Sequence, residues 1–168
     1  NVDHESEFKI IQTIRKAYPS HAILAEESGA SGRHEVTWII DPLDGTMNYA
    51  HGFPHYCISI GIKVKSRLEH GVIYDPLRDE LFVASIGTGA QLNGRKIRCR
   101  AHATLAGAFL GVSHLNSDNT AVNQSHKLSD LLANTAGVRR TGSAALDLAY
   151  VAAGRLDGFF AEQLHLWD

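Results

Sequence analysis

The chain has 168 residues, and 44% of them are hydrophobic, which is typical of a globular protein with a real core. Its formal net charge of -2 provides no large basic field, so the composition excludes nucleic acid as a predicted primary ligand. No apolar run reaches the length of a membrane span and no signal peptide pattern is present, so we expect no membrane partner. We expect one domain over residues 1–168.

The first element in chain order is an amphipathic helix. Its apolar residues recur at helical spacing, at Phe8, Ile11, Ile14 and Tyr18, and Pro19 should end the helix. The acidic residues at its start suit the positive end of a helix dipole. This pattern predicts a surface helix with one buried face.

Two short apolar strands should follow, and each runs directly into acidic residues. The first, Ala22–Ala25, precedes Glu26, and the second, at 38–40, precedes Asp41. Pro42 cannot donate to a sheet ladder and restricts the residue before it, so we expect the second strand to leave the sheet at Asp41.

The middle of the chain reads as an antiparallel meander, because short alternating segments are separated by turn residues. We expect strands at 57–64, 70–74 and 81–85, followed by a hairpin around Asn93-Gly94. Beyond it we expect a strand at 108–112, a polar connection at 113–125 and a modest helix that includes 127–132.

A second strong helix should begin at Ser143, whose hydroxyl can cap it, and should stop at Gly154. Its residues are apolar on nearly every face, so we expect it to be buried. A strand at 158–161 should then lead toward Trp167 and Asp168.

The two cysteines, Cys57 and Cys99, lack the spacing of a disulfide pair or a zinc site. We interpret them as free thiols of a reducing compartment, which predicts a cytoplasmic protein.

Acidic residues around a glycine turn form the candidate site. Asp41 lies at a predicted strand end, and Asp44 precedes Gly45, which allows a turn with exposed amides. Carboxylates arranged in this way suit Mg²⁺, although Asp-Pro and Asp-Gly are also ordinary turn dipeptides. Asp3 and Asp168 are further candidates, with a helix N-cap and a charged terminus as their plain alternatives.

Several motifs together resemble the inositol monophosphatase family of magnesium-dependent, lithium-sensitive sugar-phosphate phosphatases. They lie at residues 26–28, 38–46 with Asn48 and Tyr49, 142–146 and 167–168, and their order and spacing match throughout. The resemblance implies an α/β fold, a layered αβαβα sandwich of the inositol monophosphatase / fructose bisphosphatase type. Relatives carry an extra first helix and a long segment beyond Trp167-Asp168, so we expect this chain to be a phosphatase domain truncated at both ends.

The resemblance also implies the roles of the acidic residues. Glu26, Asp41 and the carbonyl of Leu43 would bind a first Mg²⁺, and Asp41, Asp44 and Asp168 would bind a second. The family implies two or three Mg²⁺ in each site. Clustered carboxylates raise one another's pKa, so we expect the site to be strained without cations.

The catalytic roles come from the same resemblance. Thr46, paired with Glu26, would orient and deprotonate the attacking water, while Asp3 would hydrogen-bond the threonine hydroxyl. The amides of Gly45 and Thr46 would receive the phosphate, as amides at the start of a helical turn can do in general. The expected substrate-binding residues are Asp44, Gly45, Thr46, Ser143, Ala144, Glu162 and Asp168.

One position departs from the family pattern. Relatives that act on inositol phosphates usually place a glutamate directly after the aromatic pair, where this chain has Ala161 and then Glu162. Ala161 cannot accept a hydrogen bond from a polyol, so this contact is either lost or supplied by Glu162 after a local shift.

The implied function is Mg²⁺-dependent hydrolysis of a phosphate monoester by two-metal activation of water, with inositol monophosphate or a related polyol phosphate as substrate and a homodimer as the assembly. Alternatives within the superfamily are phosphatases for histidinol phosphate, adenosine bisphosphate or fructose bisphosphate. An alternative of another class is a non-catalytic regulatory or scaffold protein. The intact acidic residues argue against it, because a scaffold has no need of mutually repelling groups.

Overall fold

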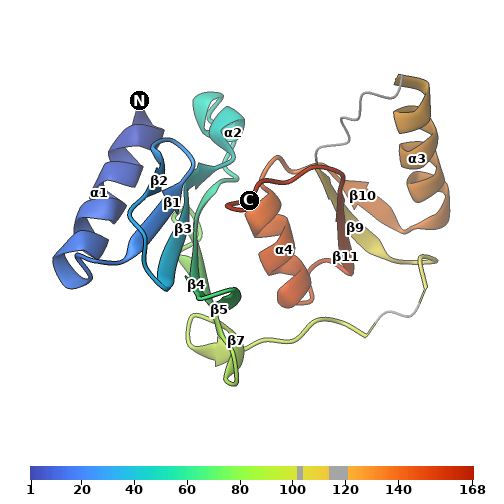
Figure 1. Ribbon diagram of the computed structural model, residues 1–168. Coiled ribbons are helices and arrows are strands. Elements are labelled where there is room, and N and C mark those ends of the chain that lie inside the picture. Colours follow the sequence, from blue (N-terminus) through green and yellow to red (C-terminus); the bar gives the residue numbers. More distant parts are fainter. Residues whose placement is uncertain (102–103, 114–120) are drawn as a thin grey trace.

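The computed structural model describes residues 1–101, 104–113 and 121–168, with the side chains of the same ranges apart from 121–127. Helices and sheets alternate through the molecule (Figure 1). Helix α1 (Val2–Ala17) covers one face of a large sheet, α4 (Ala144–Ala152) lies between this sheet and a small one, and α3 (Ala121–Asn134) lies beyond the small sheet. This arrangement confirms the predicted layered α/β sandwich.

The large sheet has eight strands in the order β2-β1-β3-β4-β5-β6-β7-β8. Strand β1 is parallel to β3, and every other neighbouring pair is antiparallel, which confirms the predicted meander. The short β2 escaped prediction because Gly, Ala and Ser give no apolar alternation. The strands are β1 (Ala22–Ala25), β2 (Gly29–Ser31), β3 (Val36–Asp44), β4 (Cys57–Val64), β5 (Arg67–Asp75), β6 (Glu80–Ser85), β7 (Gly89–Leu92) and β8 (Arg95–Lys96).

Strand β3 continues through Pro42 to Asp44, so the predicted strand end at Asp41 is wrong. The pairing between β1 and β3 stops at Ile40, and no β1 residue opposite Pro42 requires its missing amide hydrogen. The register between β3 and β4 shifts between Asp41 and Asp44. Such a bulge re-aims side chains, and here it lies at the two aspartates of the candidate site.

Helix α1 begins two residues earlier than a cap at Asp3 would require. The Asp3 amide donates to Oδ1 of Asn1 at 3.4 Å, so Asn1 is the N-cap and the N-cap alternative for Asp3 is wrong. Asp3 is instead a buried residue of the helix. The apolar face of α1 packs through Ile14 against Ile23 and Ile40 of the sheet, and the helix ends at Ala17, close to the predicted stop.

Helix α4 confirms the predicted buried helix. Ser143 is its N-cap and accepts from the amide of Leu146 at 3.4 Å. Leu146 and Ala149 form a core cluster with Cys57 and Phe82 of the large sheet. Burial of this apolar cluster fixes α4 against the sheet and places the start of the helix beside the end of β3.

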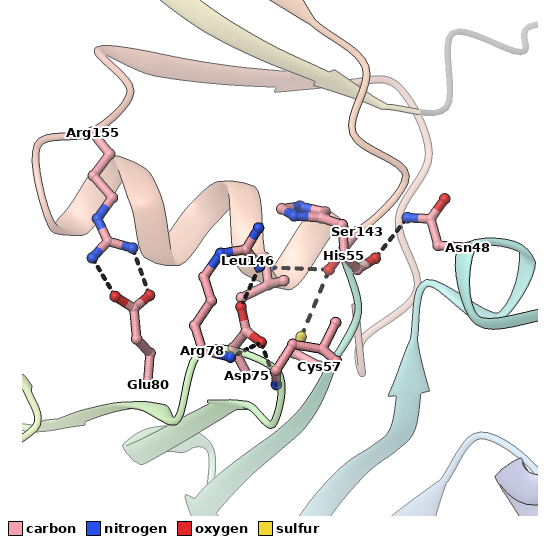
Figure 2. Close-up of polar contacts among 10 residues, drawn as sticks. Asn48, His55, Cys57, Asp75, Arg78, Glu80, Ser143, Leu146 and Arg155 are labelled. Atoms are coloured by element: carbon pink, nitrogen blue, oxygen red, sulfur yellow. Dashed lines mark hydrogen bonds and ion pairs between the residues drawn. The ribbon is translucent and has the colours of Figure 1, made fainter. Parts of the chain in front are cut away.

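An ion pair adds a second link between the α4 region and the sheet. The guanidinium of Arg155 donates to both carboxylate oxygens of Glu80 at 2.6 and 2.5 Å (Figure 2). Near it, Arg78 donates to the fully buried carboxylate of Asp75 at 2.7 Å. The two-point contact between Arg155 and Glu80 fixes the orientation of the two side chains as well as the distance between them.

The small sheet consists of three parallel strands in the order β10 (Gly137–Arg139), β9 (Phe109–Ser113) and β11 (Gly158–Ala161). The sequence predicted β9 and β11 but not the three-residue β10. Of the connection predicted at 113–125, residues 114–120 lie outside the described ranges, and 121–125 belong to α3, so the prediction is wrong there. No helix in the described part of the chain is long and apolar enough to cross a membrane.

Both cysteines are free, as predicted; Cys57 is buried and Cys99 is exposed.

Candidate active site

The ends of β1 and β3 bring Glu26 and Asp41 together. The two strands run parallel, and the Glu26 amide donates to the Ile40 carbonyl at 3.1 Å, so both acidic residues emerge at the same edge. Their carboxyl groups hydrogen-bond to each other. Asp41 is only 2% exposed, and its Oδ1 accepts from the Leu43 amide at 3.0 Å.

Electrostatics strain this pair. Burial, then the charges of Asp44 and Glu26, raise the pKa of Asp41 to about 8. Burial likewise raises the pKa of Glu26, with smaller contributions from the charges of Glu27, Asp168 and Asp3. A carboxylate pair in this environment retains a proton near neutral pH, and a bound cation would relieve the repulsion.

Asp44 is fixed by the start of α4. Its Oδ2 accepts from the Ser143 hydroxyl and from the Ala145 amide, both at 2.7 Å. Burial raises the pKa of Asp44, and the Ser143 hydrogen bond opposes this shift. The Cys57 sulfur lies 3.7 Å from the Ser143 hydroxyl oxygen, and this contact is drawn in Figure 2. Because Ser143 is fully buried and donates to Asp44, its hydroxyl supports a carboxylate rather than facing a ligand.

A tight turn follows Asp44. Gly45 has a φ of 99°, and a Cβ there would lie 3.0 Å from the His55 carbonyl oxygen, so only glycine fits. The turn leads into α2 (Thr46–Ala50), a short helix that the sequence did not predict. The exposed Thr46 donates through its hydroxyl to the Leu43 carbonyl at 3.1 Å.

Asn48 supports this turn, and sequence reasoning gave it no role beyond the family motif. Its side-chain amide donates to the carbonyls of His55 at 2.7 Å and Thr141 at 2.9 Å. Figure 2 shows the first of these contacts. A Cβ at Gly142, where φ is 88°, would lie 2.9 Å from the same Asn48 nitrogen. Asn48 therefore links α2 to the segment that precedes α4.

Asp3 and Asp168 lie at the margins of this cluster. The Thr46 hydroxyl donates to the Leu43 carbonyl rather than to Asp3, and among the described residues the buried Oδ1 of Asp3 has no hydrogen-bond partner. Asp168 is near enough for its charge to raise the pKa of Glu26 and Asp44. Its Oδ2 accepts from the His165 amide at 2.5 Å.

The remaining sequence candidates lie on the α4 side. Ala144 is buried beside Ser143, while Ala161 at the end of β11 and the following Glu162 are half-buried. Ala161 is opposite Ser113 of β9.

The donor chemistry of the cluster fits a hard divalent cation, because Asp41 interacts with the carboxylates of both Glu26 and Asp44, and carboxylate oxygens are the donors that such cations prefer. Within the described residues, however, no three or more His, Cys, Asp or Glu side chains are arranged as a metal-binding group. Asp44 and Asp168 are turned toward protein donors. The residues therefore fit Mg²⁺ by the chemistry of their oxygen donors.

Comparison with known proteins agrees with this geometry. The family model described as "Inositol monophosphatase family" matches residues 1–168. The chain is 49% identical over 174 residues to Nus factor SuhB of Pseudomonas aeruginosa, covering 99% of this chain and 64% of that protein. It is 48% identical over 171 residues to Nus factor SuhB of Escherichia coli, covering 100% of this chain and 64% of that one. It thus spans less than two thirds of these relatives.

Solved structures give the same picture. The extragenic suppressor protein suhB from Bartonella henselae superposes with a TM-score of 0.93 at 39% identity, covering 99% of this chain and 66% of that one. Inositol monophosphatase from Anabaena superposes with a TM-score of 0.92 at 44% identity, covering 99% and 67%. The fold, the acidic site and these matches agree: the chain belongs to the inositol monophosphatase family.

Proposed function

We propose that the protein hydrolyses a phosphate monoester of a sugar or polyol, and that inositol monophosphate is the first substrate to test. The observation that carries the proposal is the buried Asp41 carboxyl, hydrogen-bonded to Glu26 and repelled by Asp44. Such a site is costly for a fold to maintain unless it holds positive charge.

Mg²⁺ is the cofactor that this donor set suits best. We assign Glu26, Asp41 and the Leu43 carbonyl to one ion, and Asp41, Asp44 and Asp168 to a second. When bound, Mg²⁺ supplies the positive charge that lowers the pKa of water and stabilises the leaving alkoxide oxygen.

The chain's own residues orient the reactants. Thr46 is exposed at the start of α2, and because its hydroxyl donates to the Leu43 carbonyl, its oxygen lone pairs can accept a hydrogen bond from the attacking water. Glu26 would take the proton that this water loses, with Asp3 near it as a further buried carboxyl. The amides of Gly45 and Thr46, at the strained turn, would receive phosphate oxygens.

The alcohol end of the substrate is recognised by fewer polar groups. Ser143 is committed to Asp44, and Ala161 has no hydrogen-bonding group, which leaves Glu162 as the acidic candidate for a ring hydroxyl. A site with few such contacts discriminates weakly between alcohols. Histidinol phosphate, adenosine bisphosphate and fructose bisphosphate are therefore the competing substrates.

The test is phosphate release by the full-length protein from a panel of these phosphate esters, with and without Mg²⁺ and Li⁺. We expect turnover that requires Mg²⁺ and is inhibited by Li⁺. Asp44→Asn should abolish turnover, whereas Asp130→Asn, an exposed carboxylate of α3, should not alter it. If Asp44→Asn turned over substrate at the wild-type rate, Asp44 would not be a ligand of a metal ion needed for turnover.

A regulatory role is the second candidate, and the relatives named Nus factor SuhB favour it. The Asp44→Asn protein separates the two roles in a cell that lacks the wild-type gene. Restored growth with no phosphatase activity would assign the cellular role to binding, and failure to restore growth would assign it to hydrolysis.

A further inference from the structure

We propose that Glu7 is a positioning residue for the metal ligands, a role that rests on the proposed function. Glu7 lies on α1 and is only 4% exposed. Its Oε2 accepts from the Glu27 amide at 2.9 Å, and its Oε1 accepts from the Ser28 amide at 3.0 Å. One carboxylate thus binds the backbone of the two residues that directly follow Glu26.

The contact fixes the turn between β1 and β2 from the α1 side, in addition to the Ala25–Gly29 pairing and the His4–Glu27 ion pair. After β1 ends at Ala25, the chain turns through residues 26–28 before β2 begins at Gly29. Two hydrogen bonds to one ionised carboxylate are charge-assisted and hold both distance and orientation. The direction of the Glu26 side chain, which pairs with Asp41, therefore depends on the position of Glu7.

The same face of α1 also contacts the second acidic turn. The Ser6 hydroxyl donates to the Pro42 carbonyl at 3.0 Å, directly after Asp41. Asp3, Ser6 and Glu7 have the i, i+3, i+4 spacing of one helical face. A single helix thus fixes the backbone next to Glu26 through Glu7, and the backbone next to Asp41 through Ser6.

A purely structural role for Glu7 would be to anchor α1 on the sheet. Loss of that anchor alone would lower the unfolding temperature and leave the affinity of the folded protein for metal unchanged. A positioning role changes the affinity itself, because outer-shell groups that orient ligands set the geometry of the site.

The discriminating experiment measures Mn²⁺ binding to the full-length protein by electron paramagnetic resonance, without substrate. Glu7→Gln keeps the shape of the side chain but replaces one acceptor oxygen with a donor that faces an amide hydrogen. We expect about 10- to 100-fold weaker Mn²⁺ binding by the folded variant, the usual effect of losing an outer-shell partner. Glu5→Gln removes an exposed carboxylate from the same helix and should bind Mn²⁺ as the wild type does.

The outcomes separate the two proposals. Wild-type affinity in folded Glu7→Gln would overturn the role of Glu7 and leave the proposed function intact, whereas a wild-type protein that binds no Mn²⁺ would overturn both. If Glu7→Gln does not fold, amide hydrogen exchange on the wild type decides. Slow exchange at Glu27 and Ser28, together with weaker Mn²⁺ binding by Ser6→Ala, supports the proposal, and fast exchange at both amides or unchanged binding by Ser6→Ala contradicts it.

Discussion

The Ser143 hydroxyl donates a 2.7 Å hydrogen bond to the Asp44 carboxylate across a separation of 99 residues. It connects the end of β3 in the large sheet to the start of α4, and the Ala145 amide adds a second donor to the same oxygen. The buried helix is therefore what orients Asp44, and the proposed metal site depends on how α4 packs against the sheet.

Replacing Ser143 should test this dependence. Ser143→Ala removes both the N-cap of α4 and a donor to Asp44, so we expect a loss of about 1–3 kcal/mol in the free energy of unfolding. Urea denaturation of the full-length protein measures it. Ser20→Ala, at an exposed turn, serves as the control and should stay close to wild type. Equal stability of the two variants would show that the hydrogen bond to Asp44 contributes nothing.

Asp41→Asn should separate folding from metal binding. The neutral amide removes the charge that burial and the neighbouring carboxylates oppose, so we expect the metal-free variant to melt no lower than the wild type. Mg²⁺ at 100 times its dissociation constant should stabilise the wild type by about 2.7 kcal/mol and the variant by far less. Thermal melts with and without Mg²⁺ make the comparison, and an equal shift in both proteins would contradict the assignment of Asp41.

Asp147, which is not a proposed metal ligand, should make the stability of the protein depend on pH. Burial raises its pKa to about 6, opposed by the Thr141 hydroxyl bond and reinforced by the charge of Asp44. Because the folded-state pKa is above the unfolded value of about 3.9, this contribution to stability is complete below pH 4 and is lost as pH rises through 6.

Asp147→Asn should therefore flatten the pH dependence of stability between about pH 4 and 7. Urea denaturation at several pH values measures this, with Asp130→Asn as an exposed control. A variant with the wild-type slope would show that Asp147 titrates normally. The structural reason to expect otherwise is that the buried Oδ2 of Asp147 has no hydrogen-bond partner within the described ranges.

Thr46 should matter for turnover and little for folding, because it is exposed and its hydroxyl contacts only the nearby Leu43 carbonyl among the described contacts. Thr46→Ala should lower kcat by about 10²- to 10⁴-fold, the usual range for a lost proton-transfer group, and Thr46→Ser should restore most of it. Steady-state phosphate release measures both. If Thr46→Ala turned over as fast as wild type, the hydroxyl would have no role in orienting water.

Much of the fold could be predicted because local residue patterns indicate the longer helices and strands. Helix α1 has apolar residues at helical spacing, and β4 was predicted with its observed bounds. The three-residue β2 and β10 and the five-residue α2 are too short to show any periodicity. The course of β3 through Pro42 was not predictable either, since it depends on where its neighbour β1 stops pairing.

The candidate site likewise has residues that the sequence could predict and contacts that only the fold reveals. The sequence identified Glu26, Asp41 and Asp44 as candidates, and the structure brings Asp41 within electrostatic reach of the other two. The sequence alone could not show that Ser143 donates to Asp44, or that Glu7 binds the turn after Glu26. Both contacts join residues that are far apart in the chain. In the sequence, Glu7 has the pattern of a solvent-exposed helix residue, and only the fold shows that it is buried.

The most direct test of the central claim is anomalous X-ray diffraction from crystals of the full-length protein soaked in Mn²⁺. We predict an anomalous peak within coordinating distance of the Glu26 and Asp41 carboxylates, and a second peak beside the Asp44 carboxylate that Ser143 holds. Crystals soaked to saturation that show no peak at Glu26 and Asp41 would contradict a metal-dependent phosphatase site.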